Sequence, residues 1–324
     1  MSAASSHASL EVTQRSAARL RSASFLVTVL FAAVIGLHLL LLGLPLDWRG
    51  AELPVAIVTF LLGAGALVVR FNSGSRVGAA ACATGLFLLL SVFGAALSML
   101  ALRWGLPQAD AALRAADAAL GIDVPAVIAS LSHWPAATEA LRLVYGTSIP
   151  LLLLTIMALG LVGRQRLMWR ACLMFGGTLL TICLGSGLVP AKGAFLFLDP
   201  AAIARLPEGA GTYAFETFDL FAAGNPTSLV LTALNGVACF PSFHTAAALI
   251  LCQTGWSVRW LRPPLALWGS AVIGSTIPIG GHYVVDLVAG ALVFAGWSRL
   301  TGQLAEGRVR PLVERIPEQR LART

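Results

Sequence analysis

Long apolar runs dominate the pattern along this chain, and polar residues fall mostly between them. A ~30 Å hydrocarbon layer is crossed by about 20 helical residues, so runs of this length predict membrane-spanning helices. Seven long runs cover residues 25–44, 53–69, 77–102, 141–162, 167–189, 265–279 and 282–300. An eighth run, residues 241–256, is shorter but strongly apolar. The pattern therefore predicts an all-α fold, a polytopic membrane helix bundle of about eight spans.

The composition points the same way. The 324 residues are 57% hydrophobic and 11% charged, and the mean hydropathy is +0.83. A soluble domain carries roughly 25% charged residues, so this composition favours the membrane class. A chain of this length would suggest two domains in a soluble protein. A helix bundle in lipid does not depend on the hydrophobic effect to form its core, so one domain is predicted.

The placement of arginine predicts the orientation of the bundle. Counted in chain order, the run at residues 241–256 is the sixth of the eight. Most arginines lie before the first run, after the second, fourth and sixth runs, and after the last run, which ends at residue 300. Eight spans put all of these on one side, which the positive-inside rule makes cytoplasmic together with both termini. The net charge of +7 is thus mostly an orientation signal. No basic patch is interleaved with aromatic residues, so nucleic acid is not an expected partner.

Two segments on the opposite side, residues 103–140 and 190–240, are long enough to build a site. In the first, Asp110, Arg114 and Asp117 have helical spacing, which predicts a short amphipathic helix at the interface. A solvated lid without chemistry is the favoured interpretation of that helix.

The five cysteines lie mostly inside the apolar runs and lack metal-type spacing. They are Cys82, Cys172, Cys183, Cys239 and Cys252. We interpret them as small packing residues, not as a disulfide framework or a metal site. Cys239 is the exception by position, because it lies just before the first of two histidine motifs.

The first histidine motif reads Pro-Ser-Phe-His over residues 241–244. Proline suits the first turn of a helix, and the backbone N–H groups that follow can bind an anion, helped by the helix dipole. Ser242 adds a hydroxyl donor, and His244 can donate a proton to a departing oxygen. The long loop that leads into this motif contains the only lysine of the chain, Lys192.

The second motif places His282 and Asp286 four residues apart, on one helix face with Cβ atoms about 5–6 Å apart. A carboxylate in this position can hold one imidazole nitrogen and make the other a better nucleophile or base. Gly280 and Gly281 allow close backbone approach just before the histidine. Ser275 lies shortly upstream.

Each motif alone has a plainer interpretation, since a histidine at a membrane boundary is commonly a buried, hydrogen-bonded packing residue. Two such motifs at helix starts on one side of the membrane together predict a reaction site for an anionic group. His38, inside the first run, is interpreted as a packing residue. His7 and His133 carry no signal.

The two motifs resemble the second and third signature motifs of the type 2 phosphatidic acid phosphatase (PAP2) superfamily. In the superfamily, the second motif is Pro-Ser-Gly-His. The third motif is Ser-Arg followed by five residues, a His, three residues and an Asp. In this chain the second motif reads Pro-Ser-Phe-His, and the third begins with Ser-Thr. The resemblance implies a PAP2-like catalytic membrane domain with a six-helix core at residues 77–302, after two additional N-terminal spans at residues 25–76. The flanks are predicted to be a disordered cytoplasmic N-terminus (residues 1–24) and a basic cytoplasmic tail (residues 303–324).

The resemblance also implies a role for each motif residue. His282 would be the nucleophile that takes the phosphoryl group as phosphohistidine, Asp286 would orient it, and His244 would protonate the leaving alcohol. Water or an acceptor alcohol would then release the phosphoryl group, and neither a metal nor an organic cofactor is implied. The predicted phosphate-binding residues are Ser242, Lys192, Ser275 and Gly281.

Two departures from the superfamily pattern concern arginines. Thr276 stands where the third motif has an arginine. The first motif, Lys, six residues, Arg-Pro, is matched by Lys192 with Asp199 in the place of the arginine. An aspartate cannot replace an arginine fork, and Arg142 or Arg205 are candidates for the missing charge.

In lacking the third-motif arginine and in the residues around both histidines, the chain resembles one branch of the superfamily, that of the inositolphosphorylceramide synthases. This branch is itself similar to the sphingomyelin synthases. The expected function is an integral membrane lipid-phosphate phosphatase or phosphotransferase, with headgroup transfer of the synthase type as an alternative. The expected substrate is a phospholipid or a polyprenyl or sphingolipid phosphate. The sequence predicts neither which of these lipids is used nor the oligomeric state.

Other functions stay open at this point. His244, His282 and Asp286 form a two-histidine, one-carboxylate set that could hold iron or zinc. A non-catalytic membrane protein that binds anionic lipids is another possibility, whereas a transporter is disfavoured because the runs hold almost no charged residues. A single lysine and an Ala-, Arg- and Leu-rich composition suggest a bacterial inner membrane, with the site facing the periplasm.

Overall fold

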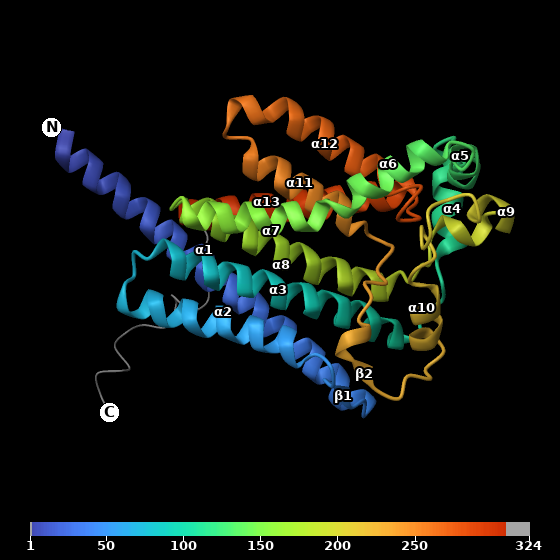
Figure 1. Ribbon diagram of the computed structural model, residues 1–324, viewed down its shortest axis with the longest axis horizontal. Coiled ribbons are helices and arrows are strands. Elements are labelled where there is room, and N and C mark those ends of the chain that lie inside the picture. Colours follow the sequence, from blue (N-terminus) through green and yellow to red (C-terminus); the bar gives the residue numbers. More distant parts are fainter. Residues whose placement is uncertain (1, 309–324) are drawn as a thin grey trace.

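The computed structural model describes residues 2–308, with side chains from residue 12 onward, and most of this part of the chain is helical. Long helices run side by side along the bundle (Figure 1). They are α1 (Ser2–Leu42), α2 (Glu52–Phe71), α3 (Arg76–Ala101), α7 (Ser148–Leu161), α8 (Gln165–Leu188) and α13 (Val284–Glu306). Helices α3 and α8 are the most buried, so they form the centre of the bundle. The fold is an all-α polytopic bundle, as predicted.

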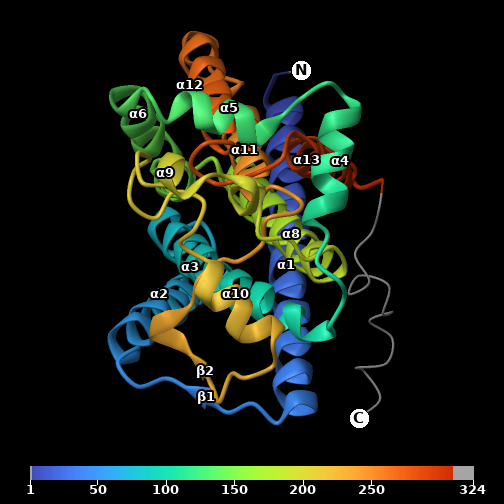
Figure 2. The same cartoon turned by 90° about the vertical axis from the view of Figure 1, so that its right-hand side faces the viewer.

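Short helices surround one end of this bundle, the right-hand end of Figure 1, which faces the viewer in Figure 2. They are α4 (Asp110–Ala119), α5 (Val124–Leu131), α6 (Pro135–Gly146), α9 (Pro200–Ile203) and α10 (Phe215–Ala222). Two further helices, α11 (Phe243–Gly255) and α12 (Arg262–Ser275), contact each other beside the long helices. Short 3₁₀ turns lie at residues 102–104, 194–197, 231–233 and 259–261.

Within residues 2–308, six helical segments are long and apolar enough to cross a membrane. One of these segments, Pro135–Leu161, consists of α6 and α7 together. The prediction of about eight spans needs a correction, because α11 has 13 residues and α12 has 14. At 1.5 Å per residue each is about 20 Å long, which is shorter than a ~30 Å hydrocarbon layer.

The arginine-rich connections share one end of the bundle. The turns α2–α3, α7–α8 and α11–α12 lie at the left of Figure 1, together with the N-terminus. Arg70 lies in the last turn of α2, and Arg164 and Arg259 lie in the two other connections. The structure therefore keeps these arginines at the end opposite to the short helices, and the assignment of this end to the cytoplasm stays a prediction.

The first helix departs from the expectation of a disordered segment at residues 1–24, which is wrong. Helix α1 begins at Ser2, and Ser16, Leu20 and Ser24 are buried. These positions recur every four residues, so they form one face that packs on α8. The predicted tail (residues 303–324) begins inside α13, and from residue 309 it lies outside the described residues.

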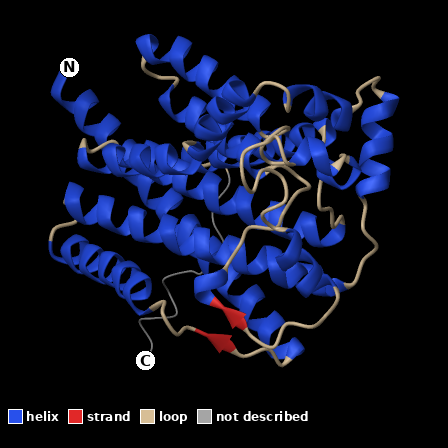
Figure 3. Cartoon of the chain, turned by 45° about the vertical axis from the view of Figure 1, so that its right-hand side comes forward, coloured by secondary structure: helices blue, strands red, loops and turns tan. Residues whose placement is uncertain are grey.

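Two short strands connect distant parts of the chain. Strand β1 (Leu46–Asp47), between α1 and α2, pairs in parallel with β2 (Leu229–Val230) in the loop that leads to α11. Figure 3 shows these strands in red at one edge of the helical bundle. They join the first two helices to the loop that enters the first histidine motif.

Glycines let the central helices approach closely. A Cβ at Gly177 of α8 would lie 2.5 Å from the ring of Trp297 in α13, and a Cβ at Gly94 of α3 would lie 2.5 Å from Leu179 in α8. Small residues at such positions allow helix backbones to come together in a membrane. Because of these contacts, α13 lies directly against the central helix, which fixes the position of its first turn.

Candidate active site

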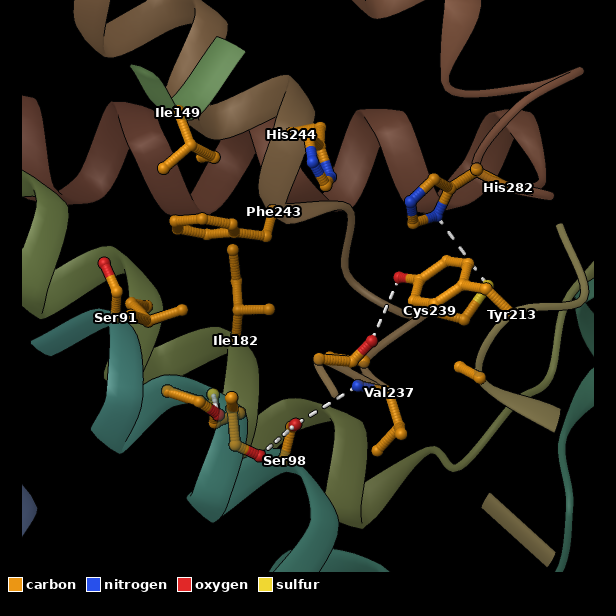
Figure 4. A pocket seen from close by; sticks show the side chains of 18 of the residues that line it. Ser91, Ser98, Ile149, Ile182, Tyr213, Val237, Cys239, Phe243, His244 and His282 are labelled. Carbon is orange, nitrogen blue, oxygen red and sulfur yellow. Dashed lines mark hydrogen bonds between the residues drawn. The ribbon is translucent and has the colours of Figure 1, made fainter. Parts of the chain in front are cut away.

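A cavity of about 240 Å³ lies between the short helices and the bundle and is lined by both motif histidines. Figure 4 shows the two imidazole rings beside each other at one side of it, His244 from the start of α11 and His282 from the loop before α13. The polar lining near the histidines includes Lys192, Tyr145, Tyr213 and Cys239. The apolar lining includes Ile149, Phe175, Leu179 and Ile182, from α7 and α8. The cavity is therefore amphiphilic, with a polar region and an apolar region.

His282 is held by the first turn of the helix that follows it. Its Nδ1 lies 3.2 Å from Asp286 Oδ2, and the same oxygen accepts a hydrogen bond from the backbone N–H of Tyr283 at 2.9 Å. An ionised carboxylate only accepts, so Nδ1 carries the ring proton and Nε2 keeps its lone pair. Both side chains are buried, at 4% and 0% exposure. This arrangement leaves Nε2 as the free nitrogen of a ring that lines the cavity.

The start of α13 is closed by an aspartate from α4. Asp117 accepts hydrogen bonds from the backbone N–H groups of Val284 at 2.8 Å and Val285 at 3.0 Å. A carboxylate at a helix N-terminus also interacts favourably with the helix dipole, by roughly 0.3–2 kcal/mol. Asp117 is 1% exposed, so the interpretation of α4 as a solvated lid is wrong.

A second aspartate of α4 fixes the loop that carries the lysine. Asp110 accepts from the backbone N–H groups of Lys192 at 3.0 Å and Gly193 at 2.7 Å. It also accepts from the hydroxyl of Tyr283 at 3.1 Å. Asp110 thereby ties Lys192 to the residue that follows His282. Two aspartates on the buried face of an otherwise alanine-rich helix were the signal in the sequence that could have shown this role.

His244 has a different kind of support. Its Nδ1 lies 2.9 Å from the hydroxyl of Tyr145, and the two rings stack with centroids 4.0 Å apart. A hydroxyl that donates to Nδ1 leaves the ring proton on Nε2. Tyr145 is a site residue that sequence reasoning missed, since a tyrosine in an apolar helix carries no pattern of its own.

The start of α11 is open. Ser242 caps the helix by accepting from the N–H of Thr245, and its own N–H donates to the carbonyl of Asp286 at 3.0 Å. Among the described residues no acceptor is bonded to the backbone N–H groups of Phe243 and His244. Both residues line the cavity.

The two helix starts are in direct contact. A Cβ at Gly290 in α13 would lie 2.2 Å from the carbonyl oxygen of Ser242, so only glycine permits this approach. The hydrogen bond from Ser242 to Asp286 joins the same two elements. The separation of the two histidines is therefore set by backbone contact and not by long side chains.

The four predicted phosphate-binding residues lie in different places. Lys192 lines the cavity, where its Nζ pairs with Asp219 and lies over the rings of two phenylalanines. Ser242 and Ser275 are fully buried, and their hydroxyls bond within α11 and α12. Gly281, at a φ of +74°, accepts a hydrogen bond from Ala194 through its carbonyl. The structure thus brings one of the four to the cavity lining, and phosphate binding by all four stays a prediction.

The candidates for the missing arginine charge lie away from the cavity lining. Arg142 pairs with Glu139 on α6 and is half exposed, and Arg205 donates to the hydroxyl of Ser132 at 3.2 Å. Thr276 is buried. Within the described part of the chain, Lys192 is the one lysine or arginine that lines the cavity.

Cys239 lies against the histidine–aspartate pair. Its Sγ is 3.7 Å from His282 Nδ1 and 3.4 Å from Asp286 Oδ2. Burial raises the pKa of the Cys239 thiol well above its usual value, and the charge of Asp286 raises it further. The Cys239 thiol is therefore protonated at neutral pH. Among the potential metal ligands, Cys239 lies beside His282 and Asp286 in the position that was predicted for His244.

The fold and the cavity together define a class, an integral membrane protein with a cavity lined by two histidines. A family model described as the PAP2 superfamily matches residues 111–299, more than half of the 324 residues. The chain therefore belongs to the PAP2 superfamily, whose members are generally phosphoric ester hydrolases. No curated protein and no solved structure matched the chain. The match begins in α4 and includes both histidine motifs, whereas α3, part of the predicted core, lies outside it.

Proposed function

We propose that this protein is a lipid-phosphate phosphatase or phosphotransferase that acts through a phosphohistidine at His282. The observation that carries the proposal is the bond from His282 Nδ1 to Asp286 at 3.2 Å, in a cavity that His244 also lines. The carboxylate holds one nitrogen and leaves the other as the nucleophile.

The first half-reaction forms the covalent intermediate. Nε2 of His282 attacks phosphorus, a P–N bond forms, and the P–O bond to the lipid alcohol breaks. His244 acts in its doubly protonated form, which the negative charge of the bound phosphate favours against the effect of burial. It donates the Nε2 proton to the departing oxygen and becomes the neutral ring, so the lipid leaves as a neutral alcohol. Asp286 stabilises the positive charge that the ring of His282 gains.

The second half-reaction restores the enzyme. His244, now without that proton, accepts one from water or from an acceptor alcohol, whose oxygen attacks phosphorus. The P–N bond breaks and His282 is free again. With water the product is inorganic phosphate, and with an alcohol it is a new phosphate ester.

The phosphate oxygens have donors near both histidines. Lys192 supplies a positive charge, and the free backbone N–H groups of Phe243 and His244 supply a helix N-terminus. Ser242, Ser275 and Gly281 complete the proposed phosphate ligands, on the basis of their positions in the two motifs. This set replaces part of the charge that the superfamily takes from arginines, and it favours a phosphate monoester or diester over a more highly charged substrate.

The apolar region of the cavity supports a lipid as the rest of the substrate. Ile149, Phe175 and Leu179 lie where the chain next to a phosphate ester would extend. A phospholipid or a polyprenyl or sphingolipid phosphate fits this polarity. Headgroup transfer, as in the inositolphosphorylceramide synthase branch, is the alternative outcome of the second half-reaction. We place the protein in a bacterial inner membrane with the site toward the periplasm, because the arginine-rich end lies opposite.

The test uses the full chain in detergent with phosphatidic acid labelled in its phosphate. Wild type is expected to release phosphate in the presence of a chelator and to form a labelled protein adduct that is labile in acid and stable in base. His282→Ala is expected to lose both signals, by about 10⁴-fold or more for turnover. His133→Ala, at an exposed loop position, is the matched control.

Other outcomes would redirect the proposal. An adduct that transfers its label only when a lipid alcohol such as diacylglycerol or ceramide is added would identify a transferase. Equal turnover in His282→Ala and wild type would exclude the phosphohistidine. Binding of phosphatidic acid without turnover in either protein would indicate a lipid-binding protein.

A further inference from the structure

Three potential metal ligands meet directly behind the proposed nucleophile. The Sγ of Cys239, a ring nitrogen of His282 and a carboxylate oxygen of Asp286 all lie within 4.8 Å of one another. All three residues are buried. A thiol, an imidazole and a carboxylate form a donor set that suits zinc and similar cations.

The distances between these atoms fit a tetrahedral site. Bond lengths of about 2.3 Å to sulfur and 2.0 Å to nitrogen and oxygen, at tetrahedral angles, separate S and N by about 3.5 Å, N and O by about 3.3 Å, and S and O by about 3.5 Å. The corresponding separations here are 3.7, 3.2 and 3.4 Å. The backbone already places the three donors at the spacing that one small cation requires, without a rearrangement of the loop or the helix.

An unsatisfied atom gives an independent indication of a ligand. Asp286 has 0% exposure, and its Oδ1 has no hydrogen-bond partner among the described residues. A buried carboxylate oxygen without a donor is costly. The separations above place the cation at Oδ2, and a cation held by both oxygens of the same carboxylate would offset that cost. Cys239 and His282 also line the cavity, which provides an entry path and a water for the fourth ligand position.

We propose that Cys239, His282 and Asp286 form a binding site for a thiophilic divalent cation such as Zn²⁺, and that the bound cation inhibits the enzyme. On binding, Sγ and Nδ1 form bonds to the metal, the thiol proton leaves to solvent, and the ring proton of His282 moves from Nδ1 to Nε2, so the ring stays neutral. Nε2 then carries a proton in place of its lone pair. It can no longer attack phosphorus. The binding step stands by itself, and the inhibition rests on the proposed function.

The binding step is tested with Co²⁺ as the spectroscopic probe. Purified full-length protein is titrated with Co²⁺, and the absorption band for charge transfer from thiolate to Co²⁺ is recorded in the near ultraviolet. We expect one equivalent to produce the band, and Zn²⁺ to displace it. Cys239→Ser is expected to lose the band. It should also weaken Zn²⁺ binding by more than roughly 10–100-fold, which is the typical cost of losing a residue that only hydrogen-bonds to a metal ligand.

Cys252→Ser is the matched control, because Cys252 bonds to the carbonyl of Leu265 in the α11–α12 hairpin, away from the cluster. It is expected to keep the band unchanged. A band that persists in Cys239→Ser, or a wild-type protein that shows none with Co²⁺ in excess, overturns the inference. Both results are independent of turnover.

The inhibition is tested by the phosphate-release assay with each variant compared with its own metal-free rate. Zn²⁺ is expected to abolish wild-type turnover and a chelator to restore it, whereas Cys239→Ser should keep its metal-free rate at the same Zn²⁺ concentration. A rise in turnover with Zn²⁺ would overturn the inhibitory role. Normal Co²⁺ binding in a protein without any turnover would remove the proposed function and leave the metal site intact.

Discussion

The starts of α11 and α13 carry the two histidines, and they are built in opposite ways. In α13 the first N–H groups are bonded to Asp117, and the histidine before them is bonded to Asp286. In α11 the N–H groups of Phe243 and His244 have no acceptor within residues 2–308, and the ring of His244 stacks on Tyr145. One start is closed by protein, and the other is left open at the cavity.

Under the proposed function, this difference separates two tasks that the two histidine motifs would perform. A nucleophile must be held in one orientation, which the closed start provides through buried carboxylates. A charged phosphate needs unpaired donors, which the open start provides. A closed start at α11 would leave the phosphate without its N–H donors, and an open start at α13 would let the nucleophile move.

The largest expected effect concerns the proton donor at the open start. For an alkyl phosphate ester, His244→Ala should lower turnover by about 10²–10⁴-fold, because the alcohol must leave with a proton. For p-nitrophenyl phosphate, whose leaving group needs no proton, the loss should be much smaller. The ratio of kcat/KM for the two substrates is the measurement. An equal loss with both esters would assign His244 to binding instead of proton transfer.

An intermediate effect is expected when the closed start is opened. Asp117→Ala leaves two buried N–H groups without acceptors, which should lower the free energy of unfolding by about 1–3 kcal/mol and turnover by about tenfold through the displaced His282. Thermal unfolding and phosphate release are measured together.

Asp123→Ala is the control for this change. Asp123 caps α5 in the same segment of the chain and is exposed. It should lose about 1 kcal/mol of stability with full activity. Comparable losses of activity in both variants would show that the closed start has no special role.

The smallest effect is expected from the ring that supports His244. Tyr145→Phe keeps the stacked ring and removes the hydroxyl bonded to Nδ1, a bond that contributes about 1 kcal/mol. Turnover of an alkyl phosphate should fall roughly fivefold, with KM nearly unchanged. The pH dependence of kcat should shift as well, since the hydroxyl influences the protonation of the imidazole. A change in KM alone would make Tyr145 a substrate contact.

The long helices could be predicted from the sequence, because each is an apolar run whose length matches the bilayer. The lengths of α11 and α12 could not, because an apolar run does not reveal where a helix begins. Residues 256–261 form a turn and a 3₁₀ segment, although the sequence there remains partly apolar. The helical start of α1 was missed for a related reason, since alanine and serine surround Leu20 on its buried face and give little hydropathy.

Within the site, the predictable part is local. The pairing of His282 with Asp286 follows from their spacing on one helix, and the cap by Ser242 follows from its place before one. The partners of these residues come from elsewhere in the chain, Asp117 from α4 and Tyr145 from α6, and no local pattern ties them to a histidine. Cys239 was noticeable by position, but its contact with Asp286 depends on how α13 packs.

The short parallel pair of β1 and β2 has a consequence for the engineering of this protein. Leu46 and Asp47, between the first two helices, are paired with Leu229 and Val230 in the loop that leads to His244. A truncated protein that starts at residue 77 would leave this loop unpaired. The N-terminal helix pair is thus no interchangeable anchor that could be removed or swapped between relatives. A chimera should therefore exchange both strands or neither.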